Sequence, residues 1–183
     1  MNKAAEYGHA LYELAAEDGI EKVIEKEFGE IAKLFESNED FINLLTNPRV
    51  ASSERIGVID QVFGNKIQPY LLSLIKILTE IRQVALIPLC FKEYQNKYYQ
   101  KNNIMLVNAI SAVELNDSQR QRIISKLEKS MNKSIILENI VDQTCIGGIR
   151  LEYNGHMIDA SIKNRLVKLQ YEIKNADYSQ AEV

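Results

Sequence analysis

Residues 20–35, IEKVIEKEFGEIAKLF, decide the fold of the first half of the chain. Apolar side chains recur there at intervals of three and four residues, and charged side chains lie between them. The apolar set is Ile20, Val23, Ile24, Phe28, Ile31, Leu34 and Phe35, and the charged set is Lys22, Glu25, Lys26 and Glu30. This spacing places the two sets on opposite faces of an α-helix. The stretch therefore predicts an amphipathic helix that packs against other helices.

Helical spacing continues on both sides of this stretch. Upstream, residues 4–16 repeat the pattern with Tyr7, Ala10, Leu11, Leu14 and Ala15. Downstream, Ser37 with Asp40 resembles a capping box for a short helix over 41–45, which Asn47-Pro48 ends. Ser52 or Ser53 is expected to cap a fourth helix with the buried face Ile56, Ile59, Val62 and Phe63, and Gly64 is placed for a left-handed C-terminal cap.

Two further helices complete the predicted N-terminal part. One runs from about 66 to 82, has Pro69 in its first turn and has the face Ile67, Tyr70, Leu71, Leu74, Ile75 and Leu78. The other runs from about 88 to 100 with the face Phe91, Tyr94 or Gln95, and Tyr98. Six short helices within about 100 residues predict a helical bundle.

The pattern changes after Asn102-Asn103. Short β-branched runs at 104–110, 135–140, 146–153 and 156–158 predict strands, and Asn154-Gly155 predicts a type I′ hairpin turn. Helical spacing returns over 116–132, where Gln119 is placed to complete a cap, and at Ile162, Leu166, Leu169 and Ile173. The predicted fold is mainly α: a six-helix bundle over 1–103, a small mixed α/β domain over 104–175, and a flexible tail over 176–183.

Composition limits the classes of function. The chain has 183 residues, 46% of them hydrophobic, and a formal net charge of −3, which suits a folded globular protein. Lys76 interrupts the most apolar run, so we expect no membrane span, and we expect no cleaved signal peptide and a cytosolic product. Cys90 and Cys145 are expected to be free thiols. The two histidines have no neighbouring cysteines, so no metal site or cofactor is predicted.

Several motifs resemble a known family. Tyr7-Gly8-His9-Ala10-Leu11 followed by Leu14-Ala15 resembles the opening helix of the delta subunits of F-type ATP synthase, the oligomycin-sensitivity-conferring protein family. The resemblance extends over about 3–173. Its other motifs are Leu44-Leu45 to Pro48, Arg82 with Leu86, Val141-Asp142, Ile146-Gly147-Gly148-Ile149-Arg150-Leu151, Gly155, Asp159-Ala160-Ser161-Ile162, Arg165-Leu166 and Leu169. Cys145, where the family prefers Leu, and Arg55, where it often has Lys, depart from the pattern.

This resemblance implies a non-catalytic stator protein with two protein partners. It implies that the bundle grips N-terminal helical segments of the alpha subunits, and that the C-terminal domain engages the C-terminal region of the b subunit. The complex would lie peripherally on the cytoplasmic side of the cell membrane. A groove between the first and fifth helices would hold the alpha segment, with the candidate contacts Tyr7, Ala10, Leu11, Leu14, Leu71, Leu74 and Leu78. No small-molecule substrate and no nucleic acid are expected.

The C-terminal motif has a structural and a chemical interpretation. Gly147-Gly148 lacks the further Gly and Lys of a phosphate-binding loop, so a strand or turn role is favoured over phosphate binding. Asp159 and Ser161 are interpreted as N-caps of the last helix rather than as a functional dyad. Gly147, Gly148, Arg150, Asp159, Ser161 and Leu166 together form the expected structural motif.

Two alternatives remain open from the residues alone. An enzyme would use Cys145 as nucleophile with His156 and Asp159 as base and orienter. A helical adaptor or RNA-binding protein would use basic and aromatic side chains: the stripe Arg122, Lys126, Lys129 and Lys133, or the cluster Lys92, Tyr94, Lys97, Tyr98, Tyr99 and Lys101. The isoelectric point of about 5.5 argues against nucleic acid, and a solvated face or an acidic protein partner accounts better for the stripe.

Overall fold

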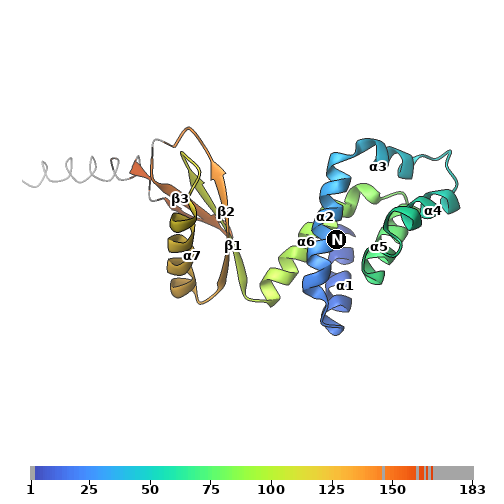
Figure 1. Cartoon of the computed structure of the whole chain (residues 1–183), viewed down its shortest axis with the longest axis horizontal. Helices are drawn as coiled ribbons and strands as arrows, with labels where there is room; N and C mark the ends of the chain where they lie inside the picture. The colour runs from blue at the N-terminus through green and yellow to red at the C-terminus, as the bar shows by residue number, and fades with distance from the viewer. Residues whose placement is uncertain (1–2, 146, 160, 163, 165, 167–183) are drawn as a thin grey trace, which may run out of the picture. The chain divides into compact units, whose positions relative to one another are not determined.

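The structure, a computed structural model, describes residues 3–145, 147–159, 161, 162, 164 and 166. It divides into two compact units, one up to Lys101 and one from Asn102 (Figure 1). The first is helical and the second contains a four-stranded sheet, which confirms the predicted fold class.

Six α-helices form the described part of the N-terminal unit, as predicted. They are α1 (Lys3–Glu17), α2 (Glu21–Ser37), α3 (Glu39–Thr46), α4 (Ser52–Phe63), α5 (Pro69–Glu80) and α6 (Ile87–Lys101), with a 3-10 helix η1 (Val84–Leu86) before α6. Pro69 is the first residue of α5, where its missing N–H leaves no hydrogen bond unmade. In the core, α1 and α2 pack against α6, and α4 packs against α5.

Aromatic side chains join the long helices of this bundle. Tyr94 of α6 is fully buried, makes edge-to-face contacts with Tyr12 and Phe28, and donates a hydrogen bond to the Glu21 carbonyl over 2.8 Å. The structure therefore selects Tyr94 over Gln95 as the core residue of α6. Helix α1 lies close to the backbone of α6 at Gly8, which is buried.

Two predicted N-terminal caps are wrong. Ser37 does not cap α3, because its hydroxyl and the Asn38 amide both donate to the Leu34 carbonyl at the end of α2. Helix α4 begins after Ala51 without a side-chain cap, and Ser52 and Ser53 lie inside it. Ala51 already has the extended backbone of an N-cap residue, with φ −63° and ψ 150°, so neither serine stands at the capping position.

Gly64 also departs from its prediction. Its φ is −18°, not left-handed, and its N–H donates to the Asp60 carbonyl over 3.0 Å, which continues the helical hydrogen bonding of α4. A Cβ at this position would meet the Asp60 carbonyl oxygen. The glycine is needed for this close approach rather than for a positive φ.

The described part of the C-terminal unit is a β-α-β-β arrangement. It contains β1 (Ile104–Ser111), α7 (Asp117–Met131), β2 (Ser134–Val141), β3 (Ile149–Tyr153) and β4 (His156–Asp159), in the sheet order β2-β1-β3-β4. The β1–β2 pair is parallel, and the other two pairs are antiparallel. Asn116 and Gln119 form a reciprocal capping box at the start of α7, as predicted.

The hairpin prediction is confirmed and the β3 prediction is too long. Asn154 and Gly155 have φ values of 45° and 77°, as a type I′ turn requires. Strand β3 starts at Ile149 rather than at 146, because Gly148 has a φ of 86° and cannot continue a strand. Most of the predicted last helix, including Leu169 and Ile173, lies outside the described residues.

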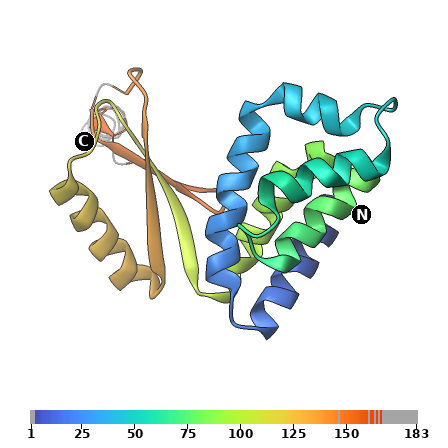
Figure 2. The same cartoon turned by 45° about the vertical axis from the view of Figure 1, so that its right-hand side comes forward.

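Helix α7 lies along one face of the sheet (Figure 2). Met105 and Val107 of β1, Ile135 of β2 and Leu127 of α7 form the core between them. Since side chains alternate between faces along a strand, Leu151 and Tyr153, which pack on this core, define the α7 side of β3. Arg150 and Glu152 lie on the other face, where their side chains form an ion pair of 3.1 Å.

Candidate partner-binding surfaces

Helix α1 leaves one flank free of contacts with α6. His9 and Glu13 lie on the α6 side, where they approach Glu93 at 3.9 Å and Lys97 at 2.6 Å. With 100° of rotation per residue, Tyr7, Ala10 and Leu14 lie on the opposite flank. The Asp18 carboxylate, just beyond α1, accepts a hydrogen bond of 2.7 Å from the Tyr70 hydroxyl of α5, so this flank adjoins α5.

Helix α5 has a matching apolar flank. Lys76 pairs with Asp60 of α4 over 2.6 Å and marks the α4 side of the helix. Tyr70, Ile77 and Ile81 lie on the side away from α4 and toward α1, and all three are exposed. Together with Tyr7, Ala10 and Leu14 they form an apolar surface over α1 and α5, which we call the α1–α5 groove.

The predicted contact residues divide into two groups. Ala10 is exposed, Leu14 is 44% exposed and Tyr7 is half-buried, so these three reach the groove. Four others lie in the bundle core with exposures of 7% or less: Leu11, Leu71, Leu74 and Leu78. Sequence reasoning missed Ile77 and Ile81, although their spacing from Tyr70, seven and eleven residues, was the available signal.

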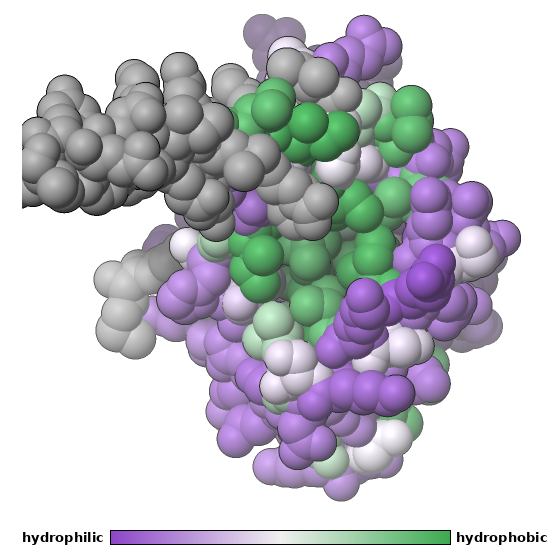
Figure 3. Space-filling model, turned by 90° about the vertical axis from the view of Figure 1, so that its left-hand side faces the viewer, coloured by the Kyte–Doolittle hydropathy of each residue, from purple (hydrophilic) through white to green (hydrophobic). Residues whose placement is uncertain are grey.

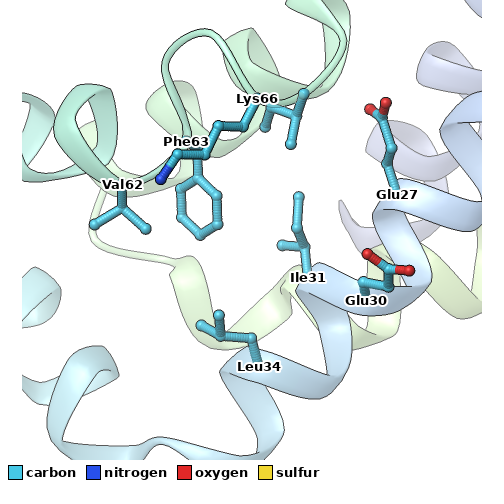
Figure 4. Close-up of a pocket in the computed structure, with 8 residues that line it drawn as sticks. Glu27, Glu30, Ile31, Leu34, Val62, Phe63 and Lys66 are labelled. Carbon is cyan, nitrogen blue, oxygen red and sulfur yellow. The ribbon is translucent and has the colours of Figure 1, made fainter.

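A hollow lies between α2 and α4 (Figure 4). Its volume is about 370 Å³, and it is lined by Glu27, Glu30, Ile31, Leu34, Val62, Phe63, Lys66 and Ile67. The Glu27 carboxylate accepts a hydrogen bond of 2.8 Å from the Gln68 backbone N–H. The lining is apolar with charged groups around it, and it includes no hydroxyl, thiol or imidazole for covalent chemistry.

The C-terminal motif makes local structural contacts. Gly147 accepts a hydrogen bond from the Ile162 N–H over 3.0 Å, and a Cβ on Gly147 would come within 2.8 Å of the Ile162 side chain. The Asp159 carboxylate accepts from the Ser161 N–H over 2.8 Å, and the Ser161 hydroxyl accepts from the Asn164 N–H over 3.2 Å. These are the hydrogen bonds of the capping interpretation. Leu166 is exposed.

The enzyme alternative finds no support in the hairpin geometry. His156 opposes Tyr153 next to the turn, whereas Asp159 opposes Arg150 at the far end of β4. Three residues of strand separate them by about 10 Å and place them on opposite faces. Cys145 is half-buried in the loop before β3. The imidazole and the carboxylate therefore do not act as base and orienter for this thiol.

Cys90 gives the bundle an alkaline limit of stability. Burial raises the pKa of its thiol from 9.0 to about 11, so the folded state favours the protonated form. This contribution to stability is complete below pH 9.0 and is lost as pH rises toward 11. We expect the melting temperature to fall across this interval, and to fall less in Cys90→Ala. Thermal melts followed by circular dichroism give the melting temperature at each pH. An equal fall of the melting temperature with pH in both proteins would contradict the prediction.

Two features are absent from the described part of the chain. No three His, Cys, Asp or Glu side chains there gather as ligands for a metal ion. None of the helices there has the length and apolar character needed to cross a membrane.

Comparison with known proteins decides the family. The family model described as "ATP synthase delta (OSCP) subunit" matches residues 4–173. The chain belongs to this family. As a member of the delta (OSCP) family it is a stator component of F-type ATP synthase, which confirms the resemblance noted in its sequence.

Relatives of the delta family match along almost their whole length. The ATP synthase subunit delta of Clostridium botulinum (strain Loch Maree) is 28% identical over 160 residues, which cover 87% of this chain and 89% of the relative. The same subunit of Clostridioides difficile (strain 630) is 28% identical over 174 residues, covering 93% and 94%. A chain in the mitochondrial ATP synthase hexamer of Toxoplasma gondii shares the fold, with a TM-score of 0.71, 15% identity and coverage of 94% and 98%.

Proposed function

We propose that this delta-family chain joins the catalytic alpha/beta hexamer to the b-subunit stalk without chemistry of its own. The N-terminal unit, residues 1–103, would bind N-terminal helical segments of the alpha subunits, and residues 104–175 would bind the C-terminal region of b. The protein would be held peripherally, on the cytoplasmic side of the membrane, through the complex. The family membership and the α1–α5 groove support this proposal.

The α1–α5 groove is the observation that carries the proposal. Two adjoining helices each direct a row of apolar side chains to solvent, an arrangement that accepts a third amphipathic helix. Ala10 is small, so a partner helix can come close to the α1 backbone there. Burying several large side chains of both proteins contributes about 1.5–3 kcal/mol each before the cost of association.

Reconstitution tests the function as a whole. The catalytic head is stripped of this protein, the full chain is added back, and attachment of the head to purified b subunit is measured by co-purification. Attachment that depends on the added chain is expected. If the head binds b equally well without it, or fails to bind b with it, the proposed linkage is wrong.

Ala10→Asp tests the α1–α5 groove. An aspartate there would bring a carboxylate into an apolar contact, so affinity for the alpha N-terminal segment should fall about tenfold or more. This affinity is measured by titrating the full chain into a labelled peptide of the alpha N-terminal segment. Ala16→Asp is the matched control, because Ala16 is exposed on the same helix but turned away from α5. The affinity of this variant for the alpha peptide should stay within about twofold of the original. Unchanged affinity in folded Ala10→Asp would refute the groove assignment.

A further inference from the structure

The two units build their apolar surfaces in different ways. Figure 3 shows hydrophobic residues gathered on the C-terminal unit, whose four strands are joined by backbone hydrogen bonds. The two apolar rows of the α1–α5 groove belong instead to separate helices, and the backbone hydrogen bonds of a helix are internal. The spacing between these rows therefore depends on side-chain contacts. A partner helix contacts both rows fully only at one spacing.

The first turn of α5 is tied to its neighbours by hydrogen bonds to two carboxylates. The Glu27 carboxylate of α2 accepts from the Gln68 backbone N–H over 2.8 Å. The Asp18 carboxylate, just beyond α1, accepts from the Tyr70 hydroxyl over 2.7 Å. The hollow between α2 and α4 adjoins this turn, because Ile67 lines it. Space therefore exists beside the first turn of α5, and these side chains hold the turn in place.

The Tyr70–Asp18 bond joins the two walls at one end of the groove. Tyr70 belongs to the exposed row of α5, and Asp18 lies about one helical turn beyond Leu14, the last residue of the α1 row. The bond to Asp18, together with the negative charges of Asp18 and Glu17, raises the pKa of the Tyr70 hydroxyl. The hydroxyl therefore keeps its proton and remains a donor at neutral pH.

We propose that Tyr70 and Asp18 are positioning residues for binding of the alpha N-terminal segment, because their hydrogen bond fixes the first turn of α5 against the end of α1. The inference rests on the proposed function, which assigns the alpha segment to the N-terminal unit. The apparent affinity for a partner falls in proportion to the fraction of molecules that have the binding-competent arrangement. Loss of the bond lowers this fraction, so it weakens binding without removing a contact with the partner.

Two single variants and their combination test this role. Tyr70→Phe removes the hydroxyl and keeps the ring of the apolar row, and Asp18→Ala removes the acceptor. The affinity of each full-length variant is measured by titration into the labelled alpha peptide, and each should bind about three- to tenfold more weakly than the original chain. The double variant should bind no more weakly than either single variant, because both changes remove the same bond. Additive losses would overturn the proposal.

A conservative variant separates positioning from direct contact. Asp18→Asn keeps an oxygen that can accept from the Tyr70 hydroxyl, so it should bind the alpha peptide more tightly than Asp18→Ala does. Glu17→Ala is the matched control, because it removes the neighbouring exposed carboxylate and leaves the Tyr70–Asp18 bond in place. Its affinity should stay within about twofold of the original. If Asp18→Asn bound as weakly as Asp18→Ala, the carboxylate charge would act on the peptide itself, and the positioning role would be wrong.

A spectroscopic measurement follows the bond without the partner. In the full chain with labelled tyrosine rings, nuclear magnetic resonance gives the pH at which the Tyr70 hydroxyl titrates. This pH should be lower in Asp18→Ala than in the original chain, because the acceptor and its charge are gone. An unchanged titration would overturn the bond. The melting temperature of each variant should stay within about 8 °C of the original, so that weaker binding does not come from unfolding.

The outcomes distinguish this inference from the proposed function. If the unaltered chain does not bind the alpha peptide, the proposed function fails, and the positioning role fails with it. If the unaltered chain binds and neither Tyr70→Phe nor Asp18→Ala changes the affinity, the proposed function stands and only the positioning role is wrong.

Discussion

Gly8→Ala is expected to lower the free energy of unfolding of the N-terminal unit by about 2–3 kcal/mol. A Cβ at this position would lie 2.6 Å from the Cys90 carbonyl oxygen and 2.9 Å from the Tyr94 backbone nitrogen. Both atoms belong to the backbone of α6, so a side-chain rotation cannot relieve the clash. The two helices must move apart, which loosens the packing of Tyr12 on Tyr94.

Thermal and urea unfolding of the full chain measure this effect. The melting temperature of the N-terminal unit should fall by about 10–20 °C. Gly57→Ala is the matched control, because Gly57 lies within α4 and a Cβ there would meet no atom within 4 Å. That variant should gain up to about 1 kcal/mol from the better helix propensity of alanine. Equal changes in melting temperature for Gly8→Ala and Gly57→Ala would show that α1 and α6 do not pack closely at Gly8.

Periodicity predicted the elements because burial is repeated along each of them. The stripe from Ile24 to Phe35 is buried in the core of the bundle, and the change to β-branched runs after Asn103 marks the start of β1. Asn154-Gly155 was equally informative, since few other dipeptides suit two successive positive φ values. These signals are local, so a single sequence carries them.

The exposed apolar row of α5 was harder to predict, because periodicity does not tell which of two adjacent apolar rows is covered. On α5, Leu71, Leu74 and Leu78 face the core, whereas the neighbouring row of Tyr70, Ile77 and the C-cap residue Ile81 faces solvent. The two rows differ by less than one quarter of a turn on average. Only the positions of α1 and α4 decide between them, and those depend on contacts distant in sequence.

The burial of Arg55 also depends on contacts that are distant in sequence. Its side chain is only 2% exposed, although charged side chains are rarely buried. One guanidinium nitrogen donates to the carbonyl oxygens of Leu45 and Thr79, each over 3.0 Å. These carbonyls lie in the last turns of α3 and α5, where the helix dipoles favour a cation, and the Thr79 carbonyl also accepts from the Arg82 N–H over 3.2 Å.

Arg55→Met should therefore destabilise the N-terminal unit by about 1–3 kcal/mol, because the buried Leu45 carbonyl loses the Arg55 donor, the Thr79 carbonyl keeps only the Arg82 N–H, and the departure of a buried charge offsets part of the loss. Arg55→Lys retains a cation, so its free energy of unfolding should fall by less. Arg82→Met is the matched control, because Arg82 is exposed and reaches the Pro48 carbonyl only over 3.4 Å. This variant should change the free energy of unfolding by less than about 0.5 kcal/mol.

Unfolding in urea with and without the alpha peptide then links this arginine to function. The end of α5 that Arg55 holds also carries Ile77 and Ile81, so loosening it should weaken peptide binding as well as stability. Arg82→Met should bind the peptide normally. If Arg55→Met lost stability but bound the alpha peptide with unchanged affinity, the end of α5 would be no part of the binding surface, and the α1–α5 groove would have to be confined to Tyr70 and the α1 flank.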